Sequence, residues 1–387
     1  MNTSEYKKFL HSCSKNIDNS KLELLDINDV VHSIFDDIDK LKLQASKIRQ
    51  KFINNIVDNL LLFEKNVTKN KANVNLCLSY DEFFESLIKL LNSKKIKEVN
   101  FFTSDFSEEL NLDNMLKSEG FSFFSKENFC SIHEPSLGIV DTGSLFSVFN
   151  SIFEMELIMD SKYKIFIIPI NKFICNISDI DIFTHIFSIY KQNSNFPSIS
   201  NIYTPNSSEI NSETHIFIVD NGRSNLLSLK EQRKSLWCIN CSACKRVCPV
   251  YQTIKDNPYN NSFTGPIANV MLPFLENYES YRHLSFNSVL CGNCSNICPM
   301  NIPISDLIIE NRKYFFDYKM MDYEDNVLFF SFKKFFFSRK NMNRKAWLKR
   351  FLLRKVLPKT VKKQIQLPRF SKKTLYQIKQ KEIKDGL

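Results

Sequence analysis

Seven of the eleven cysteines in this 387-residue chain lie between positions 238 and 298, and their spacing constrains the fold more than any other feature. The first group follows the pattern C-x2-C-x2-C-x3-C-P and consists of Cys238, Cys241, Cys244 and Cys248. The second group follows C-x2-C-x3-C-P and consists of Cys291, Cys294 and Cys298. The other four cysteines are scattered, so the gathering of these seven indicates a site.

Spacing of this kind suits a metal cluster with several corners. Three cysteines at every third position let one loop hold three corners of an iron–sulfur cubane, with backbone N–H groups turned toward the sulfur atoms. The fourth cysteine comes one helical turn later, points the other way and ligates a second cluster. This crossover rule assigns cluster 1 to Cys238, Cys241, Cys244 and Cys298. It assigns cluster 2 to Cys248, Cys291 and Cys294.

Cluster 2 is therefore one cysteine short. Ser288 stands where the first cysteine of a complete second motif would be. The fourth corner has several candidates: a distant cysteine, Ser288, water, a residue of a partner, or no ligand at all, as in a three-iron cluster. We expect two iron–sulfur clusters, both [4Fe–4S] unless the second is [3Fe–4S] or has a non-cysteine ligand.

Two other uses of clustered cysteines fit less well. Zinc sites use sets of four nitrogen or sulfur ligands, whereas these seven thiols occur without a paired histidine motif. Disulfides form in oxidising compartments, and the sequence shows no secretory signal and no run of about 18 apolar residues. Iron–sulfur ligation in a reducing, cytoplasmic location is the favoured interpretation.

The chain before the cysteines alternates between strand-like and helix-like segments, after a helical pattern over 1–70. The β-rich runs cover 74–78, 99–103, 138–149, 164–170 and 215–219. Between them lie helical stretches such as 80–91 and 178–190, the latter with Ser178 as its N-cap. This alternation predicts an α/β domain with a largely parallel sheet over 71–224. Helices joined by cysteine loops follow over 225–315, among them one over 266–278, and favour an α-helical ferredoxin arrangement.

Residues 316–387 form a basic, aromatic C-terminal tail. From position 331 onward there are 19 Lys and Arg against 2 Asp and Glu, so the net charge of +10 belongs to this tail and the preceding chain is acidic. Trp347, Phe351 and Val356 would share one side of a helix. Such a face suits docking on a partner or peripheral contact with an anionic membrane. Nucleic-acid binding is not expected, because no fold motif accompanies the charge.

Residues outside the cysteine groups give weaker signals. Glycine is scarce, with 7 residues, and no glycine-rich phosphate-binding loop occurs. No nucleophile and base can be paired, so the catalytic residues are unknown and enzymatic activity of this chain is uncertain. Asp141-Thr142-Gly143 is either a turn or the remnant of a site, and residues 220–223 (DNGR) are most simply a turn after a strand.

At the cysteines the sequence becomes similar to a known family. The segments IFIVDNGRSNLL, WCINCSACKRVCPVYQ, FTGPI and VLCGNCSNICPMNIPI resemble lactate utilisation protein B (LutB, or LldF-like), the iron–sulfur subunit of the LutABC L-lactate utilisation system. The upstream residues 138–144 are similar to the signature of that family's LUD domain. The resemblance implies a LUD domain of the NagB/RpiA/CoA-transferase-like fold, followed by an α-helical ferredoxin domain with two clusters.

The resemblance also implies a function. The chain would be the electron-transfer subunit of a complex that oxidises L-lactate to pyruvate, passing electrons singly through two clusters. Its partners would be a cysteine-rich LutA-like protein and a LUD-domain LutC-like protein, with the substrate site on or shared with a partner. An alternative is the iron–sulfur subunit of another 2-hydroxy-acid or heterodisulfide-type oxidoreductase. A zinc-stapled interaction protein is a third candidate, of a different class.

Overall fold

The computed structural model describes residues 38–123, 130–191, 199–205, 212–259 and 263–318. The described residues up to Tyr314 belong to one compact unit, and a second unit begins at Phe315. Almost all of the basic tail expected over 316–387 lies outside the described residues, as does Cys13. The account of the fold below therefore concerns the first unit.

A parallel sheet of six strands, in the order β1-β10-β7-β4-β2-β3, organises the first half of this unit. The strands are β1 (Asn73–Cys77), β2 (Glu98–Phe101), β3 (Ser122–Phe123), β4 (Cys130–His133), β7 (Tyr163–Pro169) and β10 (Glu213–Val219). The strands β7 and β10 carry the apolar runs 165–169 and 216–219, which are buried because both faces of the sheet are covered. The expected parallel α/β region is confirmed.

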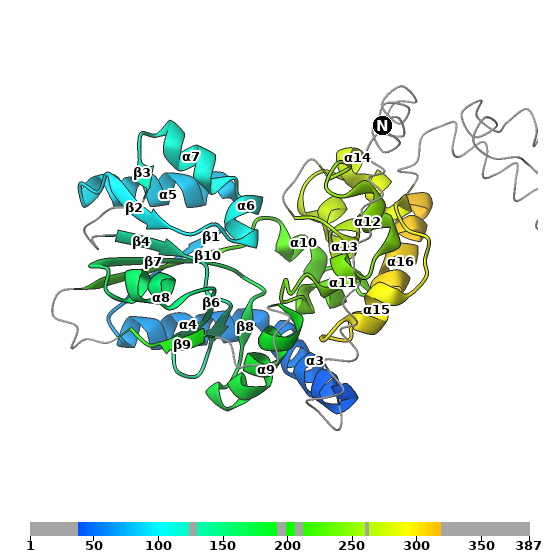
Figure 1. Cartoon of the computed structure of the whole chain (residues 1–387), viewed down its shortest axis with the longest axis horizontal. Helices are drawn as coiled ribbons and strands as arrows, with labels where there is room; N and C mark the ends of the chain where they lie inside the picture. The colour runs from blue at the N-terminus through cyan, green and yellow to red at the C-terminus, as the bar shows by residue number, and fades with distance from the viewer. Residues whose placement is uncertain (1–37, 124–129, 192–198, 206–211, 260–262, 319–387) are drawn as a thin grey trace, which may run out of the picture. The chain divides into compact units, whose positions relative to one another are not determined.

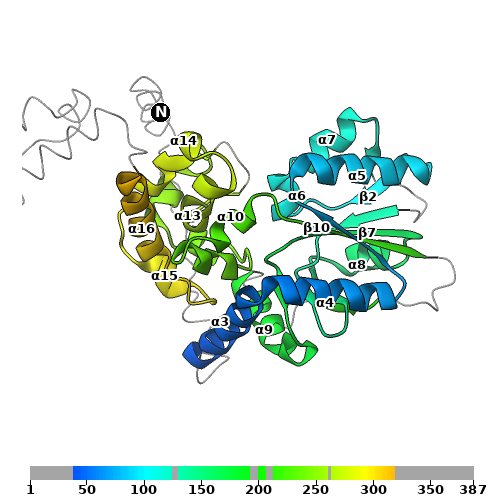
Figure 2. The same ribbon diagram turned by 180° about the vertical axis from the view of Figure 1, so that it is seen from behind.

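Helices cover both faces of this sheet (Figures 1 and 2). On one face lie α5 (Tyr80–Ser93), α6 (Asp105–Glu109) and α7 (Leu112–Ser118), whose apolar side chains form a core with Ile165 and Ile167. On the other lie α4 (Ile56–Lys69) and α8 (Ile152–Met159), over Phe166 and Ile168. The alternation of β7 side chains between two cores fixes its register in the sheet.

A second, mixed sheet has the order β8-β5-β6-β9 and was not expected. Its strands are β5 (Leu137–Ile139), β6 (Ser144–Phe149), β8 (Phe173–Ile174) and β9 (Ile199–Tyr203). The prediction of one β-rich run over 138–149 is wrong in detail, because β5 and β6 are antiparallel and joined by a turn. Gly143 has φ +66° in that turn, and a Cβ there would lie 2.8 Å from the Val67 nitrogen of α4.

Two predicted helix boundaries also need correction. Helix α9 (Ile180–Tyr190) begins two residues after Ser178, which lies inside the 3-10 turn η1 (Ile177–Asp179). Asp179 is the N-cap residue, without a side-chain capping bond. The helix expected over 266–278 ends earlier, as α13 (Pro266–Leu275), because Asn277 caps a new helix, α14 (Tyr278–Tyr281), by accepting the Glu279 N–H at 2.8 Å.

The cysteine-rich region is built from short helices. They are α10 (Arg223–Leu227), η2 (Gln232–Trp237), α11 (Ala243–Arg246), α12 (Pro249–Ile254), α13, α14, η3 (Arg282–Phe286), α15 (Asn293–Ile297) and α16 (Ile304–Asp317). The N-terminal helix α3 (Ile38–Asn54) packs against both η2 and β8. One hydrophobic core runs from Ile216 of the sheet to Leu236 and Ile267 of this region. The sheet therefore gives the cysteine loops a rigid support.

Candidate metal centres

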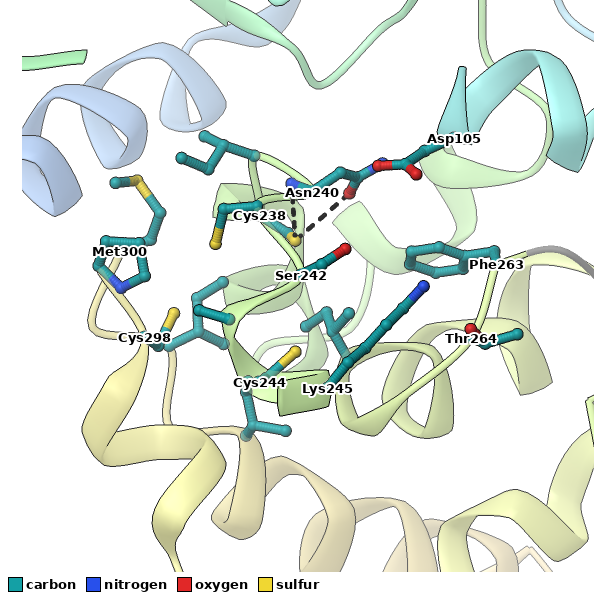
Figure 3. A pocket seen from close by; sticks show the side chains of 17 residues that line it. Asp105, Cys238, Asn240, Ser242, Cys244, Lys245, Phe263, Thr264, Cys298 and Met300 are labelled. Atoms are coloured by element: carbon teal, nitrogen blue, oxygen red, sulfur yellow. Dashed lines mark hydrogen bonds between the residues drawn. The ribbon is translucent and has the colours of Figure 1, made fainter. Parts of the chain in front are cut away.

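Four cysteines line one cavity, which we call the first cavity. They are Cys238, Cys241, Cys244 and Cys298. Figure 3 shows the side chains of Cys238, Cys244 and Cys298 around it. Three of the four come from one loop, whereas Cys298 comes from the end of α15, which packs against α11.

Three cysteines line another cavity, which we call the second cavity. They are Cys248, Cys291 and Cys294. Cys248 caps the start of α12, with Pro249 as the first helical residue, so its side chain leaves the first loop in a different direction. The structure thus gathers the seven thiols into the two sets that the crossover rule distinguishes, and as cluster ligands they stay a prediction.

The backbone of the first loop brings N–H groups to the sulfur atoms. Asn240 and Ser242 adopt left-handed conformations with φ +54° and +60°, which bend the loop tightly between the thiols. The Asn240 N–H donates to the Cys238 Sγ at 3.3 Å. The Tyr251 N–H donates to the Cys248 Sγ at 3.4 Å in the next turn. Such bonds favour the charged form of a sulfur ligand.

Burial works against the thiolate form when no metal is bound. It raises the pKa of Cys241 to about 12 and that of Cys294 to about 11, and it also raises the pKa of Cys244 and Cys298. A bound metal centre supplies the positive charge that lets such thiols lose their protons. The donor set therefore fits a cationic, sulfur-liganded group.

The thiols of the first cavity can be compared with the needs of a single metal ion and of a cluster. Within the described residues, no three His, Cys, Asp or Glu side chains converge closely enough to hold one metal ion. Four thiols nevertheless face one shared cavity. A tetrahedral zinc site needs all its ligand atoms within about 2.3 Å of one point, whereas a cubane holds its ligands farther apart on separate irons. The four thiols of the first cavity are the number that a [4Fe–4S] cluster needs.

Ser288 lines the second cavity, and its hydroxyl accepts the Leu290 N–H at 3.1 Å. Cys77, Cys130 and Cys175 lie in or beside the sheets, where burial raises the pKa of each, and are not among the residues that line this cavity. Ser288 lines the cavity, and as a fourth ligand it stays a prediction.

The first cavity also touches a helix of the α/β region. Asp105, the first residue of α6, lines it together with Lys245, Phe263 and Thr264 (Figure 3). Gly265 follows with φ +92°, and a Cβ there would meet the Lys245 side chain at 2.5 Å. Nothing in the spacing of the cysteines marks Asp105, because its approach depends on how α6 packs.

The two candidate turns are structural in this fold. The side chains of Asn66 and Asn70, on and just after α4, donate to the carbonyl oxygens of Val140, Asp141 and Thr142. The Asp220 carboxylate accepts the N–H and hydroxyl of Ser224, at 2.7 and 2.6 Å. Both loops are thus closed by the chain's own side chains.

Arg223 joins the sheet to the cysteine-rich region through a buried ion pair. Its Nη2 lies 2.8 Å from the Glu109 Oε2 of α6, and both side chains are at most 3% exposed. Its Nε donates to the side-chain oxygen of Asn171. Sequence spacing gave no sign of this pair, since the two residues are far apart in the chain.

Residues 234–302 match the model of the 4Fe-4S dicluster domain family. That match supports iron–sulfur clusters at the cysteine-rich region. Over 101 residues the chain is 46% identical to lactate utilization protein B of Exiguobacterium sp. and 43% identical to those of Bacillus thuringiensis and Bacillus cereus. Each of these alignments covers 26% of this chain and 21% of the relative. The resemblance to lactate utilisation protein B is therefore confirmed for this segment, which is about a fifth of those proteins.

A crystal structure of a DUF162 family protein from Deinococcus radiodurans is similar over 42% of this chain and 98% of its own, at 9% identity. Its TM-score of 0.32 is too low to indicate a shared fold. Among the described residues, none of the helices combines the length and the apolar character needed to cross a membrane.

Proposed function

We propose that this chain is an iron–sulfur electron-transfer subunit that serves the oxidation of L-lactate to pyruvate. The observation that carries the proposal is the gathering of four thiols at one cavity and three at another, inside the region that matches the 4Fe-4S dicluster domain, in a chain similar to lactate utilization protein B. In this proposal Cys238, Cys241, Cys244 and Cys298 hold one cluster. Cys248, Cys291 and Cys294 hold the other.

The oxidation of lactate to pyruvate releases two electrons and two protons. Each [4Fe–4S] cluster, when bound, takes up and releases one electron at a time, so two clusters suit a two-electron donor. The protein's part is to hold the sulfur ligands, to direct backbone N–H groups at them and to exclude water from the first cavity. Burial and hydrogen bonding around each cavity set its potential.

The second cluster has three cysteine ligands in this proposal, with Ser288 at the fourth corner. The Ser288 hydroxyl is a harder and less favourable ligand than a thiolate for iron in a sulfide cluster. We therefore expect this cluster to lose one iron more readily than the first. That loss would produce the three-iron form.

The substrate site belongs, in this proposal, on a partner or between subunits. The partners would be a cysteine-rich LutA-like protein and a LUD-domain LutC-like protein, and the α/β region of this chain would share the NagB/RpiA/CoA-transferase-like fold. The turn 141–143 is closed by α4, so the α/β region serves here as a support for the clusters.

A genetic experiment tests the substrate. A strain that lacks this chain should grow poorly on L-lactate, and the wild-type chain should restore growth. The Cys244→Ser variant should fail to restore growth, whereas Cys175→Ser, which alters a buried thiol beside the small sheet, is the matched control and should succeed. Normal lactate oxidation without the protein would contradict the proposal. A defect confined to another 2-hydroxy acid would favour the alternative oxidoreductase.

A further inference from the structure

Arg49 of α3 is a fully buried guanidinium next to the first cysteine loop. Its exposed fraction is 0%. Its Nε donates to the Trp237 carbonyl oxygen at 3.2 Å and its Nη2 to that of Leu236 at 3.0 Å. These are the two residues before Cys238, so the positive charge is fixed beside a proposed ligand.

The remaining N–H groups of Arg49 also bond to backbone carbonyls. They donate to the oxygen atoms of Asn171 and Phe173, in the segment that enters and forms β8. All four partners are thus neutral. Hydrogen bonding of the guanidinium is satisfied by these contacts, but its charge is not neutralised by them.

Two other buried cations have carboxylate partners. Arg223 pairs with Glu109 and Lys172 pairs with Glu134, with all four side chains at most 6% exposed. Within the described residues Arg49 forms no ion pair with an Asp or Glu side chain. A buried charge without a counter-charge is strongly unfavourable, and burial lowers the pKa of Arg49 to about 10.

We infer that the counter-charge of Arg49 is the cluster in the first cavity. This inference rests on the proposed function, because it requires a cluster held by Cys238 and its three companions. Four thiolates leave such a cluster with a net negative charge, and reduction adds one more. Arg49 therefore stabilises the reduced form more than the oxidised form, and it raises the reduction potential of this cluster.

The same contact makes α3 part of the redox centre. Through Arg49, the helix brings one positive charge to the residues just before Cys238. The guanidinium also holds the carbonyl groups of Leu236 and Trp237 by hydrogen bonds, so that their oxygen atoms do not face a buried, anionic site. Lys42, seven residues earlier on α3, donates to the Asn296 carbonyl at 3.1 Å, but it is only partly buried and lies near Cys298. Solvent screens its charge more than that of Arg49.

The test is a potentiometric titration of the reconstituted full-length chain, followed by electron paramagnetic resonance. The wild-type spectrum must contain the cluster signal that disappears in Cys244→Ser. In Arg49→Gln the potential of that signal should fall by at least 59 mV, which is a tenfold change in the reduction equilibrium constant. Arg49→Lys should shift it less, and the second signal should move little in either variant. Arg233→Gln is the matched control, since Arg233 is exposed and donates to the Leu227 carbonyl.

Selective loss of the first signal in Arg49→Gln, with both signals kept in Arg49→Lys, would also support the inference. An unchanged potential in Arg49→Gln would overturn it while leaving the proposed function intact. Equal loss of the first cluster in Gln and Lys variants would overturn it as well, because a structural role of the guanidinium would then suffice. A wild-type chain that binds no cluster at all would remove the proposed function and this inference together.

Discussion

The first and second cavities are built from similar cysteine motifs but differ in shielding. In the first, Cys241, Cys244 and Cys298 are at most 9% exposed, Asp105 lines the cavity, and Arg49 bonds to the carbonyl groups of the two residues before Cys238. In the second, Cys291 is exposed. Val289, two residues before Cys291, is 67% exposed.

This difference shows how one motif gives two chemical environments. The first loop is in contact with two helices that come from far away in the chain. Arg49 of α3 bonds to the Trp237 carbonyl, and Asp105 of α6 lines the first cavity. The second loop lies between η3 and α15 without such a cover among its lining residues. We expect the enclosed cluster to be durable and the exposed cluster to exchange electrons, and iron, more readily.

The largest expected effect comes from removing one thiol from each cavity in turn. Cys244→Ser should abolish the first cluster and remove about half of the bound iron, since cluster binding and folding of the loop are linked. Cys294→Ser should abolish the second cluster and leave the first. Iron analysis and electron paramagnetic resonance measure both, with Cys175→Ser as the control. Loss of both clusters from Cys294→Ser would show that the cavities are not independent.

The next effect concerns the support of the first cavity. Glu109→Gln leaves Arg223 buried without its counter-charge, and breaking such a pair costs about 3–5 kcal/mol. Denaturant unfolding should show this loss, and Glu108→Gln, an exposed neighbour on α6, is the control. The first cluster should then be lost at lower denaturant concentration than in the wild type. An unchanged unfolding midpoint would contradict a shared core.

A smaller effect is expected from a substitution that gives the second cavity a fourth thiol, as in the first. Ser288→Cys adds a fourth thiol to the lining of the second cavity. The second cluster should therefore keep four irons for longer during exposure to air. The signal of a three-iron cluster should decrease in the oxidised protein. Ser93→Cys, an exposed position on α5, is the control. A three-iron signal of undiminished size would mean that Ser288 does not face the open corner.

Much of this organisation could be predicted from short-range sequence pattern. The strands β7 and β10 contain the apolar runs 165–169 and 216–219 because both faces of the sheet are covered, and both strands lie close to where their sequences indicate. The division of seven cysteines into two sets follows from spacing within two loops, so no knowledge of distant contacts was needed.

What could not be predicted depends on packing between distant segments. The split at Gly143 reflects a close approach of α4, and the late start of α9 depends on Asp141, whose carboxylate accepts the Ile177 N–H. Arg49 looks like any basic residue of an amphipathic helix in the sequence. Its burial follows only when α3 packs between η2 and β8.

The most direct test of the central claim is the metal content of the full-length chain after anaerobic reconstitution, combined with Mössbauer spectroscopy. Our account predicts about 7 to 8 irons per chain, with matching sulfide and the spectrum of two cubane-type clusters. Stoichiometric zinc without iron would contradict it, and so would a wild-type chain that binds only one cluster.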